Sequence, residues 1–395
     1  MKDSKLSRVS IFLTSQVISL FGSAIVSYTI IWYITLKTSS TISLATSIVC
    51  TYLPQIFIFV FSGSWGDRYN KKILIMIGDA ITGIATFVLA ILFLNGFHSF
   101  YIIYGACALR SIGAGIQTPL VNAFLPAICP EDKLVKINGI YATASSAINI
   151  LSPAIAGILL NKMNFSYIVF VDCITATLAI VVLSRLHYKN LIIIKTKSGS
   201  TLKGFSEGVR YFKRHTFLGK LIVFYLVFYF LMSAPAFLTP VLVNVKFSGN
   251  VNALAINEFV WSIGTMLGGI LICFPKDFNK LRFMALSSAA FGVFICLLGV
   301  ANSFIIYIIM MFCAGTVLPI FNTSNTVLIQ ENVKKDMLGR TFANLNILST
   351  ISTTLGITVF GLVGDMISVD YLLASVGICI ALLSVWICKI YTGRD

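Results

Sequence analysis

Long uncharged stretches recur along this chain and constrain its fold more than any other feature of the sequence. Two of them run in succession from Arg8 to Lys37 and from Lys37 to Asp67. A helix needs about 20 apolar residues to cross a hydrocarbon core roughly 30 Å thick, and both stretches are long enough. Because 57% of its 395 residues are hydrophobic and only 11% are charged, the chain is predicted to be a polytopic α-helical membrane protein.

Twelve membrane spans are predicted, centred near residues 22, 52, 84, 110, 148, 176, 230, 264, 292, 315, 352 and 380. An even number of spans places both termini on the same side of the membrane. Short cytoplasmic loops are enriched in Lys and Arg. With the N-terminus inside, only Lys37, Lys162 and Lys246 fall on the outer connections. We therefore expect cytoplasmic termini, a bacterial-type cytoplasmic (inner) membrane, and a first span that is retained rather than cleaved as a signal peptide.

Several classes of function are disfavoured by the sequence. The net charge of +15 is explained by loops that face anionic lipid, so no nucleic-acid partner is expected. The nine cysteines form no CxxC pair, and His98, His187 and His215 are far apart, so we expect no metal and no cofactor. No G-x-x-x-x-G-K-[ST] motif occurs, which disfavours ATP as the energy source. Clustered catalytic groups are also missing, so we expect no enzymatic activity.

The longest polar stretch separates six predicted spans from six more. We expect an N-terminal six-helix bundle over residues 1–186, a cytoplasmic linker over 187–216 and a C-terminal six-helix bundle over 217–395. Residues 204–214 of the linker have apolar side chains at helical spacing, which suits an amphipathic helix on the membrane surface. A polar segment leading into the seventh span also explains that pattern.

An internal repeat relates the two predicted halves. A shift of 200 residues aligns the fourth span with the tenth, and a shift of 209 aligns the loops that precede the third and ninth spans. The matched pairs include Gly115 and Gly315, Pro119 and Pro319, Asn122 and Asn322, Glu131 and Glu331, and Asn70 and Asn279. Parallel six-span halves around a central site are the architecture of alternating-access transporters. A pore or a scaffold would not need this duplication, so we expect a transporter of small molecules.

The loop between the second and third spans carries a characteristic set of residues: Gly63, Asp67, Arg68, Asn70, Lys71 and Lys72. It resembles the signature loop of the major facilitator superfamily, G-x-x-x-D-[RK]-x-[GN]-[RK]-[RK], with Asn70 at the position that is usually Gly. The resemblance implies that these residues act as a gating motif. Asn70 suits a left-handed turn and Asp67 suits a helix cap. A simple positive-inside loop would explain the basic residues but not Gly63 and Asp67 at this spacing.

Arg110 is the only basic residue expected deep within a span, where an unpaired charge is costly. It therefore needs a partner or a function. The run from Leu109 to Gly115 resembles the superfamily's fourth-span motif R-x-x-Q-G, although the Gln is missing and the glycine comes one place early. The resemblance implies a role for Arg110 in proton coupling; the alternative is a structural ion pair.

Span five contains a second pattern that the superfamily shares. Ser152, Pro153, Ala156 and Gly157 resemble part of the antiporter motif G-x8-G-x3-G-P-x2-G-G, with several glycines replaced mostly by other small residues. The resemblance implies export rather than import. Ordinary close packing of helices explains the same composition.

Three carboxylates fall inside predicted spans: Asp79 in the third, Asp172 in the sixth and Glu258 in the eighth. A proton-driven exporter needs a carboxylate that exchanges its proton for substrate, so these residues and Arg110 are candidates for proton coupling or charge relay. Asp79 is alternatively a structural partner of the loop that contains Lys72, and the other two are alternatively helix caps or interhelical hydrogen-bond partners. Candidates for lining a substrate cavity are the polar residues Gln16, Gln117, Asn122, Asn322 and Asn325.

Within the superfamily, the chain resembles the macrolide-efflux branch over nearly its whole length. The residues that carry this resemblance are Arg110-Ser-Ile-Gly, Thr118-Pro119, Asn122-Ala, Ser152-Pro153-Ala, Phe205 with Glu207-Gly208, and Leu338-Gly339-Arg340. The resemblance implies a monomeric multidrug antiporter that exports macrolides or other lipophilic compounds in exchange for protons. The alternative on the same scaffold is an exporter or flippase of an endogenous amphiphile, such as a siderophore or a lysolipid.

Overall fold

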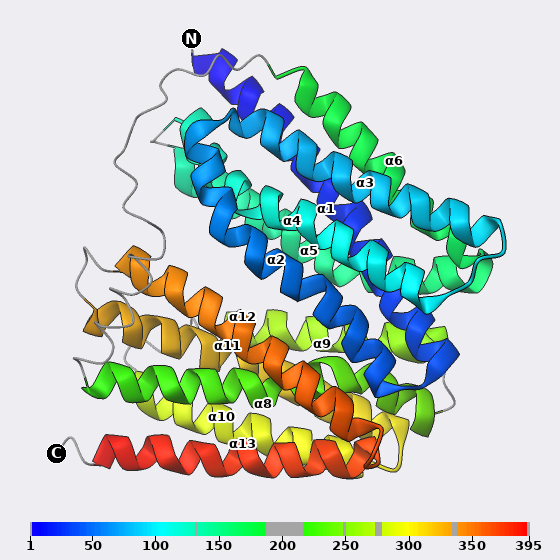
Figure 1. Ribbon diagram of the computed structural model, residues 1–395. Coiled ribbons are helices and arrows are strands. Elements are labelled where there is room, and N and C mark those ends of the chain that lie inside the picture. Colours follow the sequence, from blue (N-terminus) through cyan, green and yellow to red (C-terminus); the bar gives the residue numbers. More distant parts are fainter. Residues whose placement is uncertain are drawn as a thin grey trace. The chain divides into compact units, whose positions relative to one another are not determined.

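The computed structural model describes residues 2–130, 133–186, 216–247, 250–272, 279–333 and 338–392. Twelve α-helices and no strand lie in these residues, which confirms the predicted all-helical fold. The first six are α1 (Lys2–Thr38), α2 (Thr41–Arg68), α3 (Lys71–Leu94), α4 (Phe100–Ile128), α5 (Leu134–Lys162) and α6 (Phe165–Ser184). The others are α8 (Thr216–Lys246), α9 (Val251–Leu271), α10 (Lys280–Val300), α11 (Phe304–Asn332), α12 (Leu338–Gly364) and α13 (Val369–Thr392), as labelled in Figure 1.

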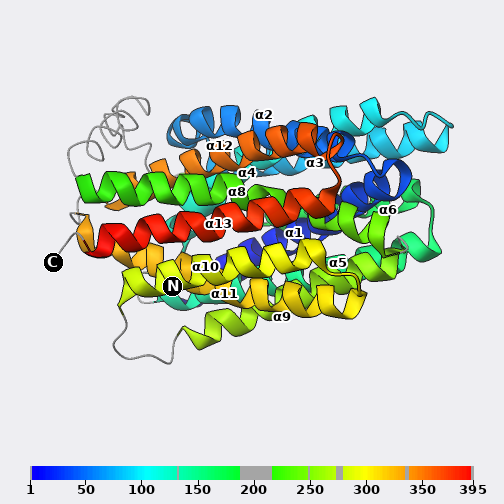
Figure 2. The ribbon, with the colours of Figure 1, turned by 90° about the horizontal axis from the view of Figure 1, so that it is seen from below.

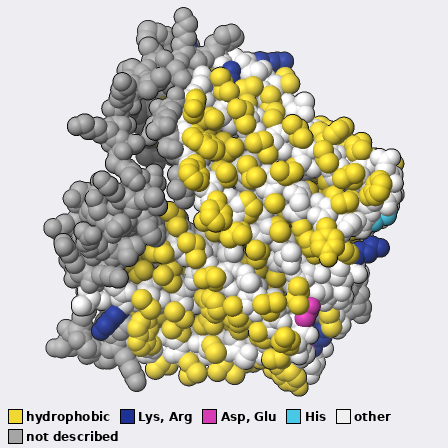
Figure 3. Space-filling model, viewed as in Figure 1, with side chains coloured by type: hydrophobic (Ala, Val, Ile, Leu, Met, Phe, Trp, Pro, Cys, Tyr) yellow, Lys and Arg dark blue, Asp and Glu magenta, His cyan; other side chains and the backbone are white. Residues whose placement is uncertain are grey.

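Each of the twelve predicted spans is centred within one of these helices. In the described part of the chain, 11 helices are long and apolar enough to cross a membrane. The exception is α4, whose mean hydropathy is lowered by polar residues that include Arg110 and Gln117. Large apolar side chains remain exposed on the helices, among them Ile84 at 63% and Ile305 at 72%. Hydrophobic side chains cover much of the described surface in Figure 3, as expected for helices surrounded by lipid.

Contacts divide the chain into two compact units. The first comprises Met1–Ile34 and Thr46–Ser198, and the second comprises Thr35–Ala45 and Gly199–Asp395. The corner where α1 ends and α2 begins therefore belongs to the second unit, although most of both helices belongs to the first. No pattern in the sequence indicates this exchange. The predicted linker helix at 204–214 lies outside the described residues.

Equivalent helices pack in equivalent ways in the two units. In the first unit α3 packs against α4 and α6, and in the second unit α10 packs against α11 and α13. Figures 1 and 2 both show α8 and α13 running side by side in the second unit. The third helix of each half thus contacts the fourth and sixth helices of its own half, as expected if the halves are repeats.

The glycine pair matched by the 200-residue shift supports this equivalence. A Cβ atom at Gly115 would lie 2.9 Å from Ile58 Cβ of α2, and a Cβ atom at Gly315 would lie 2.8 Å from the Trp261 carbonyl oxygen of α9. Both distances are too short for a side chain. Both glycines therefore allow the fourth helix of a half to approach the second closely, which is a common use of small residues in membrane helices.

A second matched pair, Asn70 and Asn279, begins the third helix of each half. The Asn70 side chain accepts a hydrogen bond from the Lys72 backbone N–H at 3.0 Å, and the Asn279 side chain accepts one from the Arg282 N–H at 3.0 Å. Both residues are N-caps. Asn70 has φ −65° and ψ 112°, so the predicted left-handed turn at this position is wrong. The free N–H groups of the first helical turn favour the capping conformation instead.

Candidate functional site

One face of α1 carries a row of polar side chains. Gln16, Ser19, Ser23 and Ser27 follow one another at intervals of three or four residues, so they lie on the same side of the helix. Gln16 is 2% exposed and Ser19 is 6% exposed. Buried polar groups need hydrogen-bond partners. The packing of α3, α4 and α6 in the first unit supplies those partners.

Asp79 of α3 lies opposite the first part of this row. Its Oδ1 accepts a hydrogen bond from Ser19 Oγ at 2.5 Å and another from Gln117 Nε2 at 2.9 Å. Gln117 Nε2 also donates to Gln16 Oε1 at 3.2 Å. These four side chains, from α1, α3 and α4, are called the Asp79 group below.

The carboxyl group of Asp79 is only partly satisfied. The residue is 1% exposed, and its Oδ2 has no hydrogen-bond partner. No Lys or Arg in the described part of the chain forms an ion pair with it. An ionised carboxylate in such a site is costly because it is buried away from bulk solvent and faces no described cation.

A close crossing of α3 and α4 brings Gln117 to Asp79. A Cβ atom at Gly78, the residue before Asp79, would lie 2.9 Å from the Gly113 carbonyl oxygen and 3.2 Å from Gln117 Cβ. Gln117 lies one helical turn after Gly113, so the crossing sets the separation of the two side chains. The geometry of the Asp79 group is therefore fixed by backbone packing as well as by its hydrogen bonds.

Arg110 of α4 and Asp172 of α6 lie opposite the second part of the row. Arg110 Nη2 is 3.2 Å from Asp172 Oδ2, and the two side chains are 9% and 1% exposed. Ser23 Oγ donates to Asp172 Oδ1 at 2.8 Å, while Arg110 Nη2 donates to the Ser23 carbonyl oxygen at 3.1 Å. The buried arginine thus has an acidic partner on another helix, and Ser23 contacts both charges.

Lys72 and Asp79 are not partners, contrary to one alternative derived from the sequence. Lys72 Nζ donates to the carbonyl oxygens of Ser184 and Leu186 at 2.9 and 2.8 Å, at the end of α6. A cation is favourable there because helix C-termini carry unsatisfied carbonyl groups. Seven residues along α3 correspond to about 10 Å of rise, which separates Asp79 from Lys72.

Half of the six residues of the gating motif lie outside the described side chains. Those of Gly63, Asp67 and Arg68 are not described, although the backbone of all three lies in α2. Lys71, like Lys72, lies in the first turn of α3. In the second unit, Lys280 at the start of α10 is 3.1 Å from Glu331 near the end of α11.

Glu258 lies in the second turn of α9 and is partly exposed. Its Oε1 accepts a hydrogen bond from Asn257 Nδ2 at 3.2 Å, and Asn257 Oδ1 accepts one from the Tyr307 hydroxyl at 2.7 Å. Asn257 and Tyr307 are both 0% exposed. Glu258 therefore lies at the edge of a buried polar contact between α9 and α11.

The remaining candidates are dispersed. Asn322 Oδ1 accepts a hydrogen bond from the Tyr229 hydroxyl at 3.1 Å, Asn325 is 3% exposed with an unpartnered Oδ1, and Asn122 is exposed. In α5, Ser152, Pro153, Ala156 and Gly157 are all buried, as expected for small residues at a helix contact.

Reasoning from the sequence did not identify two residues that form interhelical hydrogen bonds, Ser19 and Asp365. Ser19 was detectable, since it continues the helical spacing from Gln16 to Ser23. Asp365 was not detectable: at the end of α12, its Oδ1 accepts hydrogen bonds from the Thr41 backbone N–H at 2.7 Å and from the Thr41 hydroxyl at 2.6 Å. Ser40 Oγ donates to Asp365 Oδ2 at 2.8 Å. Asp365 thus caps the N-terminus of α2 from within the second unit.

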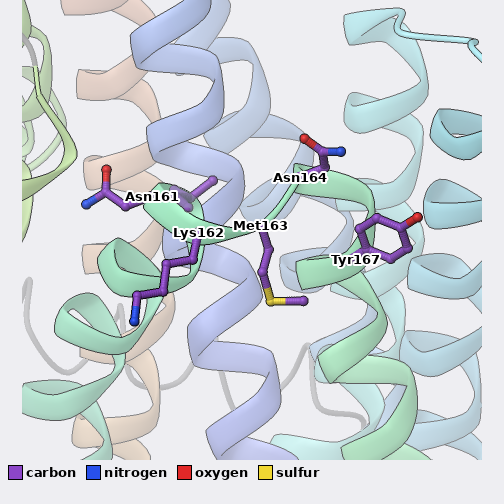
Figure 4. A pocket seen from close by; sticks show the side chains of 6 residues that line it. Asn161, Lys162, Met163, Asn164 and Tyr167 are labelled. Atoms are coloured by element: carbon purple, nitrogen blue, oxygen red, sulfur yellow. The ribbon is translucent and has the colours of Figure 1, made fainter.

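A hollow of about 380 Å³ lies at the turn between α5 and α6, away from the acidic residues. It is lined by Leu160, Asn161, Lys162, Met163, Asn164 and Tyr167, five of which are labelled in Figure 4. All belong to one turn and the adjacent helix ends. No group of His, Cys, Asp and Glu residues in the described part of the chain could hold a metal ion.

Known proteins resemble this chain in sequence and in fold. The family model described as Major Facilitator Superfamily matches residues 12–387. The chain belongs to the major facilitator superfamily. Solved structures with a similar fold include that of the nucleoside transporter NupG, with a TM-score of 0.74, 14% identity, and coverage of 98% of this chain and 99% of that one. A bacterial homologue of the iron transporter ferroportin, in an inward-facing state, gives a TM-score of 0.75 at 12% identity and covers 97% and 98% of the two chains.

Two curated relatives match this chain over most of its length. Macrolide efflux protein A of Streptococcus pyogenes is 25% identical over 376 residues, which are 93% of each chain. The staphyloferrin A transporter of Staphylococcus aureus (strain NCTC 8325 / PS 47) is 25% identical over 333 residues, which are 82% of this chain and 81% of the relative. The chain is thus a multi-pass membrane transporter, similar to proteins named for the movement of two chemically different compounds.

Proposed function

We propose that this transporter exports lipophilic or amphiphilic compounds of the macrolide type in exchange for protons, by alternating access. Export of macrolides is supported by the similarity to macrolide efflux protein A over 93% of the chain. Proton exchange is supported by the Asp79 group, because a buried carboxyl without a cationic partner is suited to binding a proton. That unpaired carboxyl is the single observation that carries the proposed energy coupling.

The transporter would act as a monomer in the cytoplasmic membrane of a bacterium, with both termini inside the cell. This orientation is supported by the few basic residues on the opposite side, Lys37, Lys162 and Lys246. Gly63, Asp67 and Arg68 would regulate alternation of access from the cytoplasmic side, and the Asn residues of α4 and α11 would contact substrate. No catalytic step is part of this proposal.

A second candidate substrate class is an endogenous amphiphile such as a siderophore or a lysolipid. The similarity to the staphyloferrin A transporter favours it, since that relative is named for a compound other than a macrolide. The residues that carry the repeat and the gating motif set the scaffold, and they do not distinguish these two classes.

Inverted membrane vesicles distinguish the two classes directly. Vesicles containing the wild-type protein are loaded with an acidic interior, and uptake of radiolabelled erythromycin, of a siderophore and of a lysophospholipid is compared with and without a pH gradient. We expect gradient-dependent uptake of erythromycin. Gradient-dependent uptake of the siderophore or lysolipid alone would favour the second class, and uptake that ignores the gradient would contradict proton antiport.

A further inference from the structure

We infer that Asp79 is the residue that binds and releases the exchanged proton, and that the Arg110–Asp172 ion pair holds the surrounding helices together. The inference rests on the proposed proton antiport and adds the identity of the proton-binding group. It distinguishes the two buried aspartates of the first unit by their partners, since Asp172 faces a basic residue and Asp79 faces none in the described residues.

The first argument is the difference in compensation of charge. Asp172 faces Arg110 at 3.2 Å and accepts a hydrogen bond from Ser23, so its negative charge is balanced. Asp79 has no such cation in the described residues, and both of its hydrogen bonds reach Oδ1. Proton binding at the unpartnered Oδ2 forms an O–H bond and leaves a neutral acid, which costs less in an apolar bundle than the carboxylate.

The second argument concerns the neighbours of Asp79. Ser19 and Gln117 each have both donor and acceptor capacity, so their hydrogen bonds can be maintained or rearranged in either protonation state. Gln117 is connected onward to Gln16. The Asp79 group therefore tolerates a carboxyl that gains and loses a proton. A site built for a permanent carboxylate would instead contain a basic residue.

The charged groups around Asp79 are consistent with this division. On α6 the titratable neighbour is Asp172, which interacts with Asp79 electrostatically, and on α4 the charged residue is Arg110. The row on α1 contributes only amide and hydroxyl groups near Asp79. A negative charge on Asp79 would be repelled by the like charge of Asp172, so the neutral acid is the less costly form of Asp79.

Glu258 is the competing candidate. Its side chain is partly exposed, lies in the second turn of α9 and accepts a hydrogen bond from Asn257. A partly exposed carboxylate can be hydrated, so its ionised form is less costly than that of Asp79. Asp79 lies at a similar distance from the start of its own helix, and it is only 1% exposed.

The titrating residue is identified without any substrate by infrared difference spectroscopy of the purified full-length protein in lipid, between alkaline and acidic pH. A protonated carboxyl group gives a distinct carbonyl stretching band. We expect Asp79→Asn to lose one component of this band, while Asp79→Glu and the surface control Asp370→Asn retain it. Asp172→Asn, or Arg110→Met with Asp172→Leu if the single variant does not fold, should retain the Asp79 component as well. Retention of every component in a folded Asp79→Asn protein would overturn the inference.

Coupling is tested with erythromycin in proteoliposomes. Asp79→Asn should still exchange internal for external erythromycin, but its erythromycin accumulation driven by a pH gradient should fall at least tenfold. Glu258→Gln should retain both activities. Full gradient-driven accumulation by Asp79→Asn, or its loss in Glu258→Gln alone, would overturn the assignment to Asp79. Absence of gradient-driven accumulation in the wild type would instead contradict the proposed function, and the infrared result would still decide whether Asp79 titrates.

Discussion

Arg110 and Asp172, which lie on α4 and α6, form an ion pair with 3.2 Å between Nη2 and Oδ2 in the interior of the first unit. Removing one charge leaves the other buried and uncompensated, so Arg110→Ala should lower the free energy of unfolding by about 3–5 kcal/mol. Replacing both residues by apolar ones of similar size, Arg110→Met with Asp172→Leu, should restore most of this stability. The measurement is unfolding in mixed detergent micelles, and a double variant as unstable as the single one would contradict a structural pair.

Asp365 provides a prediction of pH dependence outside the membrane spans. Burial alone would raise the pKa of Asp365, but hydrogen bonds from Thr41 and Ser40 outweigh it, so the pKa lies below its ordinary value. The stabilisation of α2 by this cap is therefore complete above the ordinary pKa of a carboxyl group and is lost as the pH falls through the lowered pKa. Hydrogen exchange of the backbone N–H of Thr41 should accelerate, relative to its intrinsic rate, only in that acidic range.

The matched variants for this cap are Asp365→Ala and Asp370→Asn. Asp365→Ala should destabilise the start of α2 by about 1 kcal/mol, because the Thr41 N–H loses its acceptor. Asp370 pairs with Lys246 at 2.9 Å and makes no described contact with α2, so Asp370→Asn should leave exchange at Thr41 unchanged. Equal protection of Thr41 in the wild type and Asp365→Ala would show that Asp365 does not act as the cap.

Asn70 and Asn279 allow a test of the repeated N-caps. Asn70→Ala and Asn279→Ala should each lower the free energy of unfolding by about 0.5–2 kcal/mol, since each removes the acceptor for a first-turn N–H. Asn70→Gly, which restores the residue usual in the signature loop, should cost only a few tenths of a kcal/mol by the same scale. Unfolding in mixed micelles measures all three, and a larger loss for Gly than for Ala would contradict the capping role.

The Asp67→Asn variant tests the gating motif, because it removes the charge of this side chain and keeps its shape. Asp67→Asn should insert in normal amount and bind substrate, yet lose at least tenfold in the rate of transport, because the charge and not the volume is changed. Membrane insertion is measured by quantitative blotting of membranes, and transport by erythromycin uptake into inverted vesicles. Ile73→Val, at an exposed apolar position of α3, is the control that should leave both unchanged.

The spans and the repeat were predictable because hydropathy and short spacings are properties of the local sequence. The environment of Asp79 was not, because it depends on which faces of α1, α3 and α4 meet. Ser19 and Asp79 are 60 residues apart, and Gln117 and Asp79 are 38 apart. Nearness in sequence suggested Lys72 as the partner of Asp79 instead. Two helical turns separate those residues, whereas the close crossing at Gly78 brings Gln117 within hydrogen-bond distance.

The same distinction explains the result at Asn70. Asn is favourable both in left-handed turns and at helix N-caps, so its identity alone did not decide between the two. The free N–H of Lys72 at the start of α3 decides it. The cap by Asp365 depends on a contact between residues 324 apart, which nothing in the sequence indicated.

Proton movement by the wild-type protein tests the central proposal most directly. Purified protein is reconstituted into liposomes that contain a pH-sensitive dye, and erythromycin is added on one side in the absence of any imposed gradient. The proposed antiport predicts that erythromycin drives proton movement in the opposite direction through the wild type, and that Asp79→Asn abolishes this proton signal while erythromycin still exchanges. Erythromycin transport by the wild type without any accompanying proton movement would contradict the proposal.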